Sequence, residues 1–198
     1  MIKAVLFDFD GVICNSFEIA YSVARITNDN LSRDEYRDFF NGNFYQEKKI
    51  TKEVSRKFFE LQNERFKDVV IDDDVKEVIR ELKKDHELYI VSSNLEETIH
   101  WTFKNSSLSE GLFNEVLGYE SGKSKIEKIQ YILDKYNLKK EDCVFVTDTL
   151  GDILEATVVG IGSIGIDTGF HDRKRLEAGK PKKIVSSFRE LLLTIKNL

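Results

Sequence analysis

The sequence has few of the residues that crosslink or interrupt a chain. It contains one proline and two cysteines among 198 residues, and it has no Gly/Ser-rich tract. Two cysteines cannot make a disulfide framework, so we expect a reducing environment, with the cytoplasm as the simplest location. Because no linker composition is present, the sequence offers no obvious boundary between separate domains.

Long apolar runs are also missing. No segment approaches the roughly 18 apolar residues that a membrane-spanning helix needs, so we predict no membrane span. The first residues, MIKAVLF, have neither a basic region nor a cleavage site, so we expect no secretion signal. The net charge of −5 argues against a dedicated nucleic-acid binder. The 33% of charged residues are typical of a globular protein.

Short apolar segments alternate with helical patterns through most of the chain. Such segments lie at 3–9, 87–93, 143–148, 162–167 and 182–187, with a weaker one at 114–120. In segment 72–84, one helical face is apolar and consists of Val75, Val78, Ile79 and Leu82. Strands that alternate with helices of this length form βαβ units. We therefore predict an α/β fold, namely a three-layer, doubly wound parallel sheet with a Rossmann-like core.

Segment 16–70 interrupts this alternation. It contains helical patterns such as FEIAYSVARI (17–26) and TKEVSRKFFELQNERF (51–66), but no convincing strand. A single crossover rarely needs several helices in series, so we favour a small helical cap inserted after the first strand over a long crossover packed into the core. The predicted division is an α/β core of residues 1–15 and 71–198 and a cap of residues 16–70.

Polar residues gather where the predicted strands end. These residues are Asp8, Asp10, Ser92, Ser93, Asn94, Asp148 and Asp152. The carboxyl ends of parallel strands face one ligand crevice. Two carboxylates ~4 Å apart repel by about 4 kcal/mol at an effective dielectric near 20, so a cation is expected between them. An all-oxygen site with lysines nearby suits Mg²⁺ and a phosphoryl group. We also expect Asn94 to cap the following helix, with Glu97 completing a capping box.

Four segments together resemble the motifs of the haloacid dehalogenase superfamily. They are DFDGV (8–12), VSSN (91–94), a lysine ahead of a helix, and DTLGD (148–152). The resemblance runs from residue 3 to about 190, and segment 165–191 is similar to phosphoglycolate phosphatase-like members. It implies a Mg²⁺-dependent phosphatase that hydrolyses a small phosphorylated metabolite through an aspartyl phosphate.

The resemblance also implies the catalytic and phosphate-binding roles. Asp8 would be the nucleophile that attacks phosphorus, and Asp10 would protonate the leaving group and then activate water. Dehalogenases, which expel halide, lack that second aspartate, so DFD favours phosphate chemistry. Ser92 would donate a hydrogen bond to the phosphoryl group, with Ser93 in the same phosphate-binding segment.

The metal site and the lysine follow from the same resemblance. Mg²⁺ would be held by the carboxylates of Asp8 and Asp148 and by the main-chain carbonyl of Asp10, while Asp152 would orient the metal's waters or the lysine. The family pattern KPxPxxF is replaced here by KSKIEKI (123–129). Aligning the apolar positions of the two patterns selects Lys123, and Lys125 is the alternative.

Two other functions stay open at this point. A phosphomutase would use the same aspartyl phosphate but pass it to a sugar. A phospho-acceptor signalling module also combines aspartates, Mg²⁺, a hydroxyl and a lysine, but the aspartates at the first strand and the helical insert count against it. His86, His100 and His171 have no metal-ligand spacing, so we interpret them as ordinary surface or half-buried residues. Nothing in the sequence requires more than a monomer.

Overall fold

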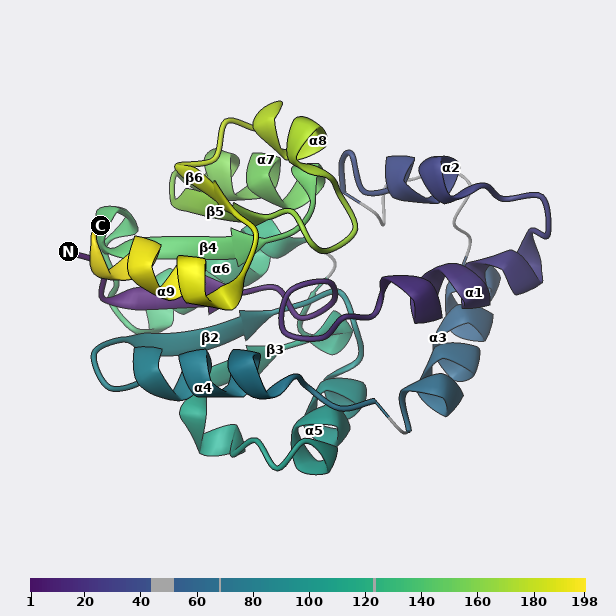
Figure 1. Cartoon of the computed structure of the whole chain (residues 1–198), viewed down its shortest axis with the longest axis horizontal. Helices are drawn as coiled ribbons and strands as arrows, with labels where there is room; N and C mark the ends of the chain where they lie inside the picture. Colours follow the sequence, from purple (N-terminus) through teal and green to yellow (C-terminus); the bar gives the residue numbers. More distant parts are fainter. Residues whose placement is uncertain (44–51, 68, 123) are drawn as a thin grey trace.

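The predicted parallel sheet forms the centre of the protein (Figure 1). A computed structural model describes residues 1–43, 52–67, 69–122 and 124–198. Neighbouring strands pair in parallel in the order β3-β2-β1-β4-β5-β6. The strands are β1 (Ala4–Phe7), β2 (Glu87–Val91), β3 (Glu115–Leu117), β4 (Cys143–Thr147), β5 (Gly162–Ile166) and β6 (Lys183–Val185). The predicted fold class is therefore confirmed.

Both faces of the sheet are covered by helices, which is why the strands read as continuous apolar runs. Along β1, Val5 and Phe7 point to one side, and Ala4 and Leu6 to the other. The first side packs against α4 (Asp73–Leu82), α5 (Glu96–Asn105) and α9 (Phe188–Lys196). The second packs against α6 (Lys125–Lys135) and α7 (Leu150–Val159). The short helix α8 (Arg173–Glu177) lies beside α7, β5 and β6.

The local signals in the sequence place most of these helices correctly. The predicted apolar face of α4 is buried, with acidic residues in its first turn and Arg80 in its last. For α5 the predicted cap is wrong, because Leu95 occupies the N-cap position and Asn94 makes no cap. The carboxamide of Asn94 is instead hydrogen bonded to Asp10, a contact that local sequence could not indicate.

Three helices lie beyond the carboxyl ends of the strands (Figure 1). They are α1 (Phe17–Thr27), α2 (Arg33–Asp38) and α3 (Lys52–Phe66). They share a small core with one residue of the loop after β5. Phe58 of α3 packs against its buried residues, which are Phe17, Ala20, Ala24, Leu31, Tyr36 and Phe170. In the described parts of segment 16–70 every regular element is helical. This arrangement supports the cap and core division, which we retain as a proposal.

The strand order sets the position of the ligand crevice. In the sheet, β2 pairs with one edge of β1 and β4 pairs with the other edge. The helices that follow β2 and β4 cover opposite faces of the sheet. The opening between them lies at the carboxyl ends of β1, β2 and β4.

Short 3-10 turns lie at Glu110–Leu112 (η2), Tyr119–Ser121 (η3) and Lys140–Asp142 (η4). Among the described helices, none has the length and apolar character needed to span a bilayer.

Candidate active site

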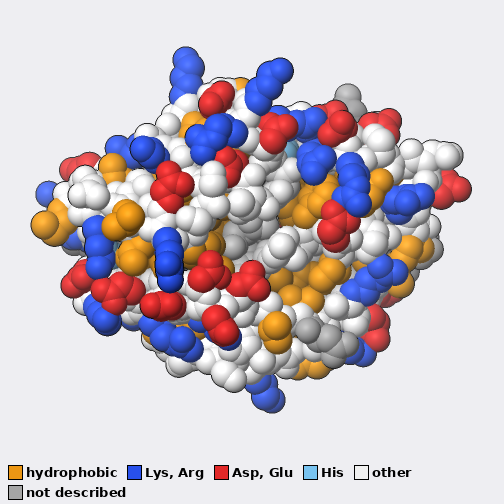
Figure 2. All heavy atoms as spheres, viewed as in Figure 1, with side chains coloured by type: hydrophobic (Ala, Val, Ile, Leu, Met, Phe, Trp, Pro, Cys, Tyr) orange, Lys and Arg blue, Asp and Glu red, His pale blue; other side chains and the backbone are white. Residues whose placement is uncertain are grey.

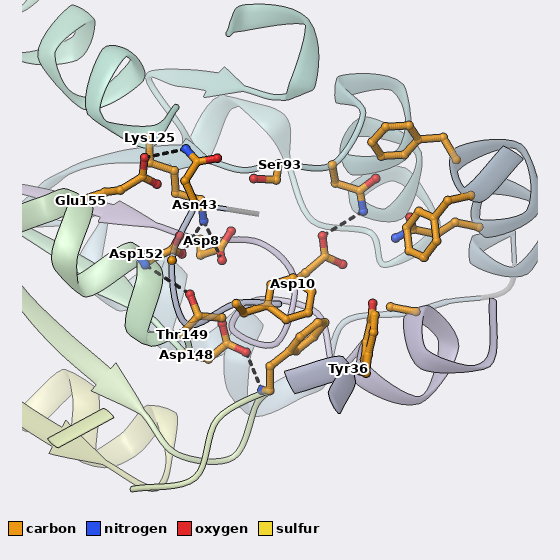
Figure 3. Close-up of a pocket in the computed structure, with 18 residues that line it drawn as sticks. Asp8, Asp10, Tyr36, Asn43, Ser93, Lys125, Asp148, Thr149, Asp152 and Glu155 are labelled. Atoms are coloured by element: carbon orange, nitrogen blue, oxygen red, sulfur yellow. Dashed lines mark hydrogen bonds and ion pairs between the residues drawn. The ribbon is translucent and has the colours of Figure 1, made fainter. Parts of the chain in front are cut away.

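A pocket lies at the carboxyl ends of the strands, between the sheet and helices α1 to α3 (Figure 3). The predicted site residues that line it are Asp8, Asp10, Ser93, Asp148 and Asp152. Lys125, the alternative lysine, also lines the pocket. Lys123, the preferred lysine, lies outside the described residues. The fold thus brings motifs from β1, β2, α6 and β4 to one place.

Lys125 joins two of the predicted carboxylates. Its Nζ atom lies 2.8 Å from Asp8 Oδ2 and 2.5 Å from Asp152 Oδ2. Burial raises the pKa of Asp8 well above its ordinary value, and the ammonium of Lys125 opposes this shift. Burial alone would lower the pKa of Lys125, but Asp152 and Asp8 outweigh it and raise that pKa. The proton therefore stays on Lys125, which lies as a cation between two acids.

Asp152 is held in place by residues of its own segment. Its Oδ2 atom also accepts a hydrogen bond from Thr147 Oγ1 at 2.7 Å. The side chain of Thr149 caps α7 by accepting from the Asp152 backbone N–H. Asp152 and Lys125 are both almost fully buried, so this contact fixes the direction of the ammonium toward Asp8. The geometry supports the lysine-orienting role predicted for Asp152.

Asp10 lies in the tight turn that follows β1. Gly11 adopts a φ of +71° there, which favours glycine. The two carboxylate oxygens of Asp10 accept hydrogen bonds from Ser16 Oγ at 2.6 Å and from Asn94 Nδ2 at 3.0 Å. Burial raises the pKa of Asp10, although both hydrogen bonds oppose the rise. A fixed carboxyl group with a raised pKa can carry a proton closer to neutral pH, as a general acid must.

Asp148 is enclosed by backbone. Its Oδ2 atom accepts the N–H of Phe170 at 2.6 Å. A Cβ atom at Gly11 would lie 1.8 Å from this oxygen, and one at Gly169 would lie 2.2 Å from it, so both positions need glycine. The other oxygen, Oδ1, is buried and has no hydrogen-bond partner among the described residues. Burial raises the pKa of Asp148 to about 8.

These oxygens form a donor set that fits Mg²⁺. Asp8, Asp10 and Asp148 line the same pocket, and the Oδ1 atom of Asp148 has no hydrogen-bond partner among the described residues. In the described part of the chain, no group of three His, Cys, Asp or Glu side chains is arranged to hold a metal. Two carboxylates and one carbonyl suit Mg²⁺, which keeps several waters and takes few protein ligands.

The two serines after β2 face different surroundings. Ser92 is fully buried, and its Oγ atom accepts the N–H of Asn94 at 3.0 Å. Its carbonyl oxygen accepts a hydrogen bond from Lys128, a buried lysine on α6. Ser93 lines the pocket, and Ser92 is not among the described lining residues. The geometry therefore favours Ser93 over Ser92 as the hydroxyl that meets a phosphoryl group.

Lys128 gives a pH-dependent prediction. Burial, followed by the nearby charge of Lys125, lowers its pKa to about 8 from 10.5. Between these pH values the unfolded chain binds more protons than the folded protein, so raising the pH stabilises the folded state. We expect this gain, about 3 kcal/mol, to be missing in Lys128→Met. Urea unfolding of both proteins at several pH values from 7.5 to 10.5 measures it, and parallel pH profiles would contradict it.

His171 is a buried residue that the sequence reading missed. It is 1% exposed, so its interpretation as a surface or half-buried residue was wrong. Its Nδ1 atom accepts the N–H of Leu150 at 3.0 Å, so Nε2 carries the proton and donates to the carbonyl of Arg37 at 2.9 Å. His171 thus joins the start of α7, which carries Asp152, to α2. The position of His171 shortly after the predicted strand at 162–167, at the edge of the crevice, was the one sequence feature that could have indicated its burial.

Comparison with known proteins agrees with this arrangement. The sequence matches the haloacid dehalogenase-like hydrolase family over residues 5–166. The pyrophosphatase PpaX of Bacillus cereus is 25% identical over 213 residues, covering 100% of this chain and 98% of that protein.

Solved structures show the same fold. A predicted phosphatase from Clostridium acetobutylicum superposes with a TM-score of 0.80 at 22% identity, over 100% of both chains. A predicted phosphoglycolate phosphatase from Haemophilus somnus gives a TM-score of 0.78 at 23% identity, over 98% of both chains. The family match covers most of the chain and spans the residues from Asp8 to Asp152 that meet in the pocket. The chain therefore belongs to the haloacid dehalogenase-like hydrolases.

Proposed function

We propose that this protein is a Mg²⁺-dependent phosphatase that hydrolyses a small phosphomonoester through an aspartyl phosphate on Asp8. The observation that carries the proposal is the shared pocket of Asp8, Asp10, Lys125 and Asp148. A second aspartate beside the nucleophile supplies the leaving-group acid that ester cleavage needs. The names of the relatives, a pyrophosphatase and phosphatases, support the same reaction class.

In the first step, a carboxylate oxygen of Asp8 attacks phosphorus in line with the leaving group. The P–O bond to the leaving group breaks, and Asp10 gives its proton to the departing oxygen. In the second step, Asp10 takes a proton from water, whose oxygen attacks the same phosphorus. The phosphorus–Asp8 bond breaks, phosphate leaves, and both carboxyl groups return to their starting states.

The remaining residues stabilise the phosphoryl group. We assign the lysine role to Lys125, because its ammonium already lies 2.8 Å from Asp8. Ser93 would donate a hydrogen bond to a phosphoryl oxygen. When bound by Asp8, Asp148 and the Asp10 carbonyl, Mg²⁺ would neutralise charge on the phosphoryl oxygens. We propose no partner chain, because the proposed nucleophile, acid and lysine all line the described pocket. A cytoplasmic location is proposed from the cysteine content alone.

Metal binding has a readout that does not depend on turnover. At a Mg²⁺ concentration a hundredfold above Kd, we expect stabilisation of about 3 kcal/mol. For a chain of this length, that raises the melting temperature by about 5 to 10 °C. Asp148→Asn, which retains an acceptor for Phe170, should lose most of this shift, while the exposed control Asp85→Asn should keep it. An equal shift in Asp148→Asn would remove Asp148 from the metal site.

The reaction itself is tested by phosphate release from p-nitrophenyl phosphate. Turnover should require Mg²⁺ and stop with EDTA. Turnover that persists undiminished after complete metal removal would overturn the Mg²⁺-dependent mechanism.

A further inference from the structure

Side chains from α2, the turn after it, α3 and the loop after β5 form a second part of the pocket, which we call the leaving-group subsite. Its described residues are Tyr36, Phe40, Phe58, Phe59, Gln62 and Phe170. On α3, Gln62 follows Phe58 by four residues and Phe59 by three, so all three lie on one helical face. Five of these six side chains are aromatic, which makes the subsite largely apolar.

The aromatic rings are held by one another and by the core. The Phe40 ring meets Tyr36 edge-on at 5.3 Å and Phe170 at 4.9 Å between centroids. Across the pocket, Phe59 packs on Tyr119 of the core at 5.1 Å. Figure 2 shows hydrophobic side chains gathered near the start of α1, beside the hollow in the middle of this face. Fixed aromatic walls favour a ligand with flat apolar faces.

Two uncharged polar side chains line this apolar part. Gln62 is 3% exposed, and its Oε1 atom has no hydrogen-bond partner among the described residues. A buried acceptor without a partner is costly, so a ligand that donates to it gains binding free energy. Tyr36 is 2% exposed, and its hydroxyl group points toward Asp10 (Figure 3). A hydroxyl there can donate or accept.

The charges around the subsite disfavour a second anionic group on the substrate. Among the described lining side chains, Lys125 alone is cationic, and it is already shared by Asp8 and Asp152. Asp10 and Glu155 also line the pocket. An anionic leaving group would thus approach carboxylates rather than a cation.

We infer that the leaving-group subsite takes an uncharged ring that carries a hydroxyl or N–H group. This group would donate a hydrogen bond to Gln62 Oε1, and Tyr36 would be the second polar contact. This inference rests on the proposed function and names its substrate class. It separates the protein from its relative named a pyrophosphatase, because pyrophosphate and phosphoglycolate both have anionic leaving groups.

A substrate panel tests the inference. Uridine monophosphate and glucose phosphate supply uncharged rings, while pyrophosphate and phosphoglycolate supply anionic leaving groups. We expect the best ring ester to exceed both anionic substrates in kcat/KM by about tenfold or more. Gln62→Leu should lower kcat/KM for that ester by about tenfold relative to p-nitrophenyl phosphate, which lacks the donor. Tyr36→Phe should also lower kcat/KM for the ring ester relative to p-nitrophenyl phosphate. The control Gln130→Leu on α6 should leave this ratio unchanged.

The outcomes separate this inference from the proposed function. Absence of Asp8-dependent release from p-nitrophenyl phosphate would remove the proposed function. Calorimetry on the Asp8→Asn protein with Mg²⁺ then still tests the subsite, because it measures binding without turnover. Ring esters should bind more tightly than pyrophosphate, and adding Gln62→Leu should weaken the binding of the ring esters. Faster turnover or tighter binding of pyrophosphate or phosphoglycolate would overturn the inference. So would a Gln62→Leu variant that affects every substrate equally.

Discussion

Asp8→Asn is expected to reduce phosphate release from p-nitrophenyl phosphate by at least about a thousandfold. That corresponds to about 4 kcal/mol of transition-state stabilisation. The amide of asparagine cannot attack phosphorus in place of the carboxylate. The measurement is initial-rate kinetics of both proteins at saturating Mg²⁺.

Loss of folding cannot account for this effect. Asp8 is buried beside Lys125, and Lys125 keeps Asp152 as an ionic partner when Asp8 becomes an uncharged amide. We therefore expect the variant to stay folded and to lose less stability than Lys125→Met. A variant that folds normally and retains more than about a tenth of the activity would exclude Asp8 as the nucleophile.

Lys125→Met is expected to lower both activity and stability. It removes the ammonium that lies between Asp8 and Asp152, which leaves two buried carboxylates facing one another. Removing one partner of a buried ion pair typically costs 3–5 kcal/mol, so we expect a destabilisation of about 4 kcal/mol at neutral pH. Turnover should fall by at least about a hundredfold, because the phosphoryl oxygens lose their cation.

The pH dependence of Lys125→Met gives a second check. Burial already raises the pKa of Asp8, and loss of the ammonium removes the effect that opposed it. A carboxyl group whose folded-state pKa is raised stabilises the protein below its unfolded pKa and loses that stability as pH rises. The variant should therefore be closest to wild type in acid. Lys123→Met is the matched control and should keep near-normal turnover. If Lys123→Met lost turnover while Lys125→Met kept it, the lysine role would belong to Lys123.

The strand ends were predictable because they depend on local pattern. A buried strand shows a short apolar run, and parallel strands must end at one edge of the sheet. Asp8 and Asp148 follow such runs directly, and Asp10 and Asp152 lie a few residues further on, so their meeting in one pocket required no knowledge of tertiary contacts.

Other site residues depend on contacts between distant segments, which local pattern does not encode. Asn94 reads as a helix cap, yet its carboxamide donates to Asp10, 84 positions earlier. Lys125 is joined to Asp152 across the contact between α6 and α7. Gln62 is one polar residue in a charged helical segment, and only packing reveals that its oxygen is buried without a partner. In each case the side chain's role is set by what lies opposite it in the fold.

The aspartyl phosphate on Asp8 is the central claim, and direct detection tests it most closely. Asp10→Asn should slow hydrolysis of the intermediate, because no base remains to activate water. The measurement is acid quenching of this variant during reaction with p-nitrophenyl phosphate, followed by peptide mass spectrometry. The account predicts one added phosphoryl group on the peptide that contains Asp8, absent in the Asp8→Asn, Asp10→Asn double variant. A phosphoryl group on another residue, or none at Asp8 while the wild type turns over, would contradict it.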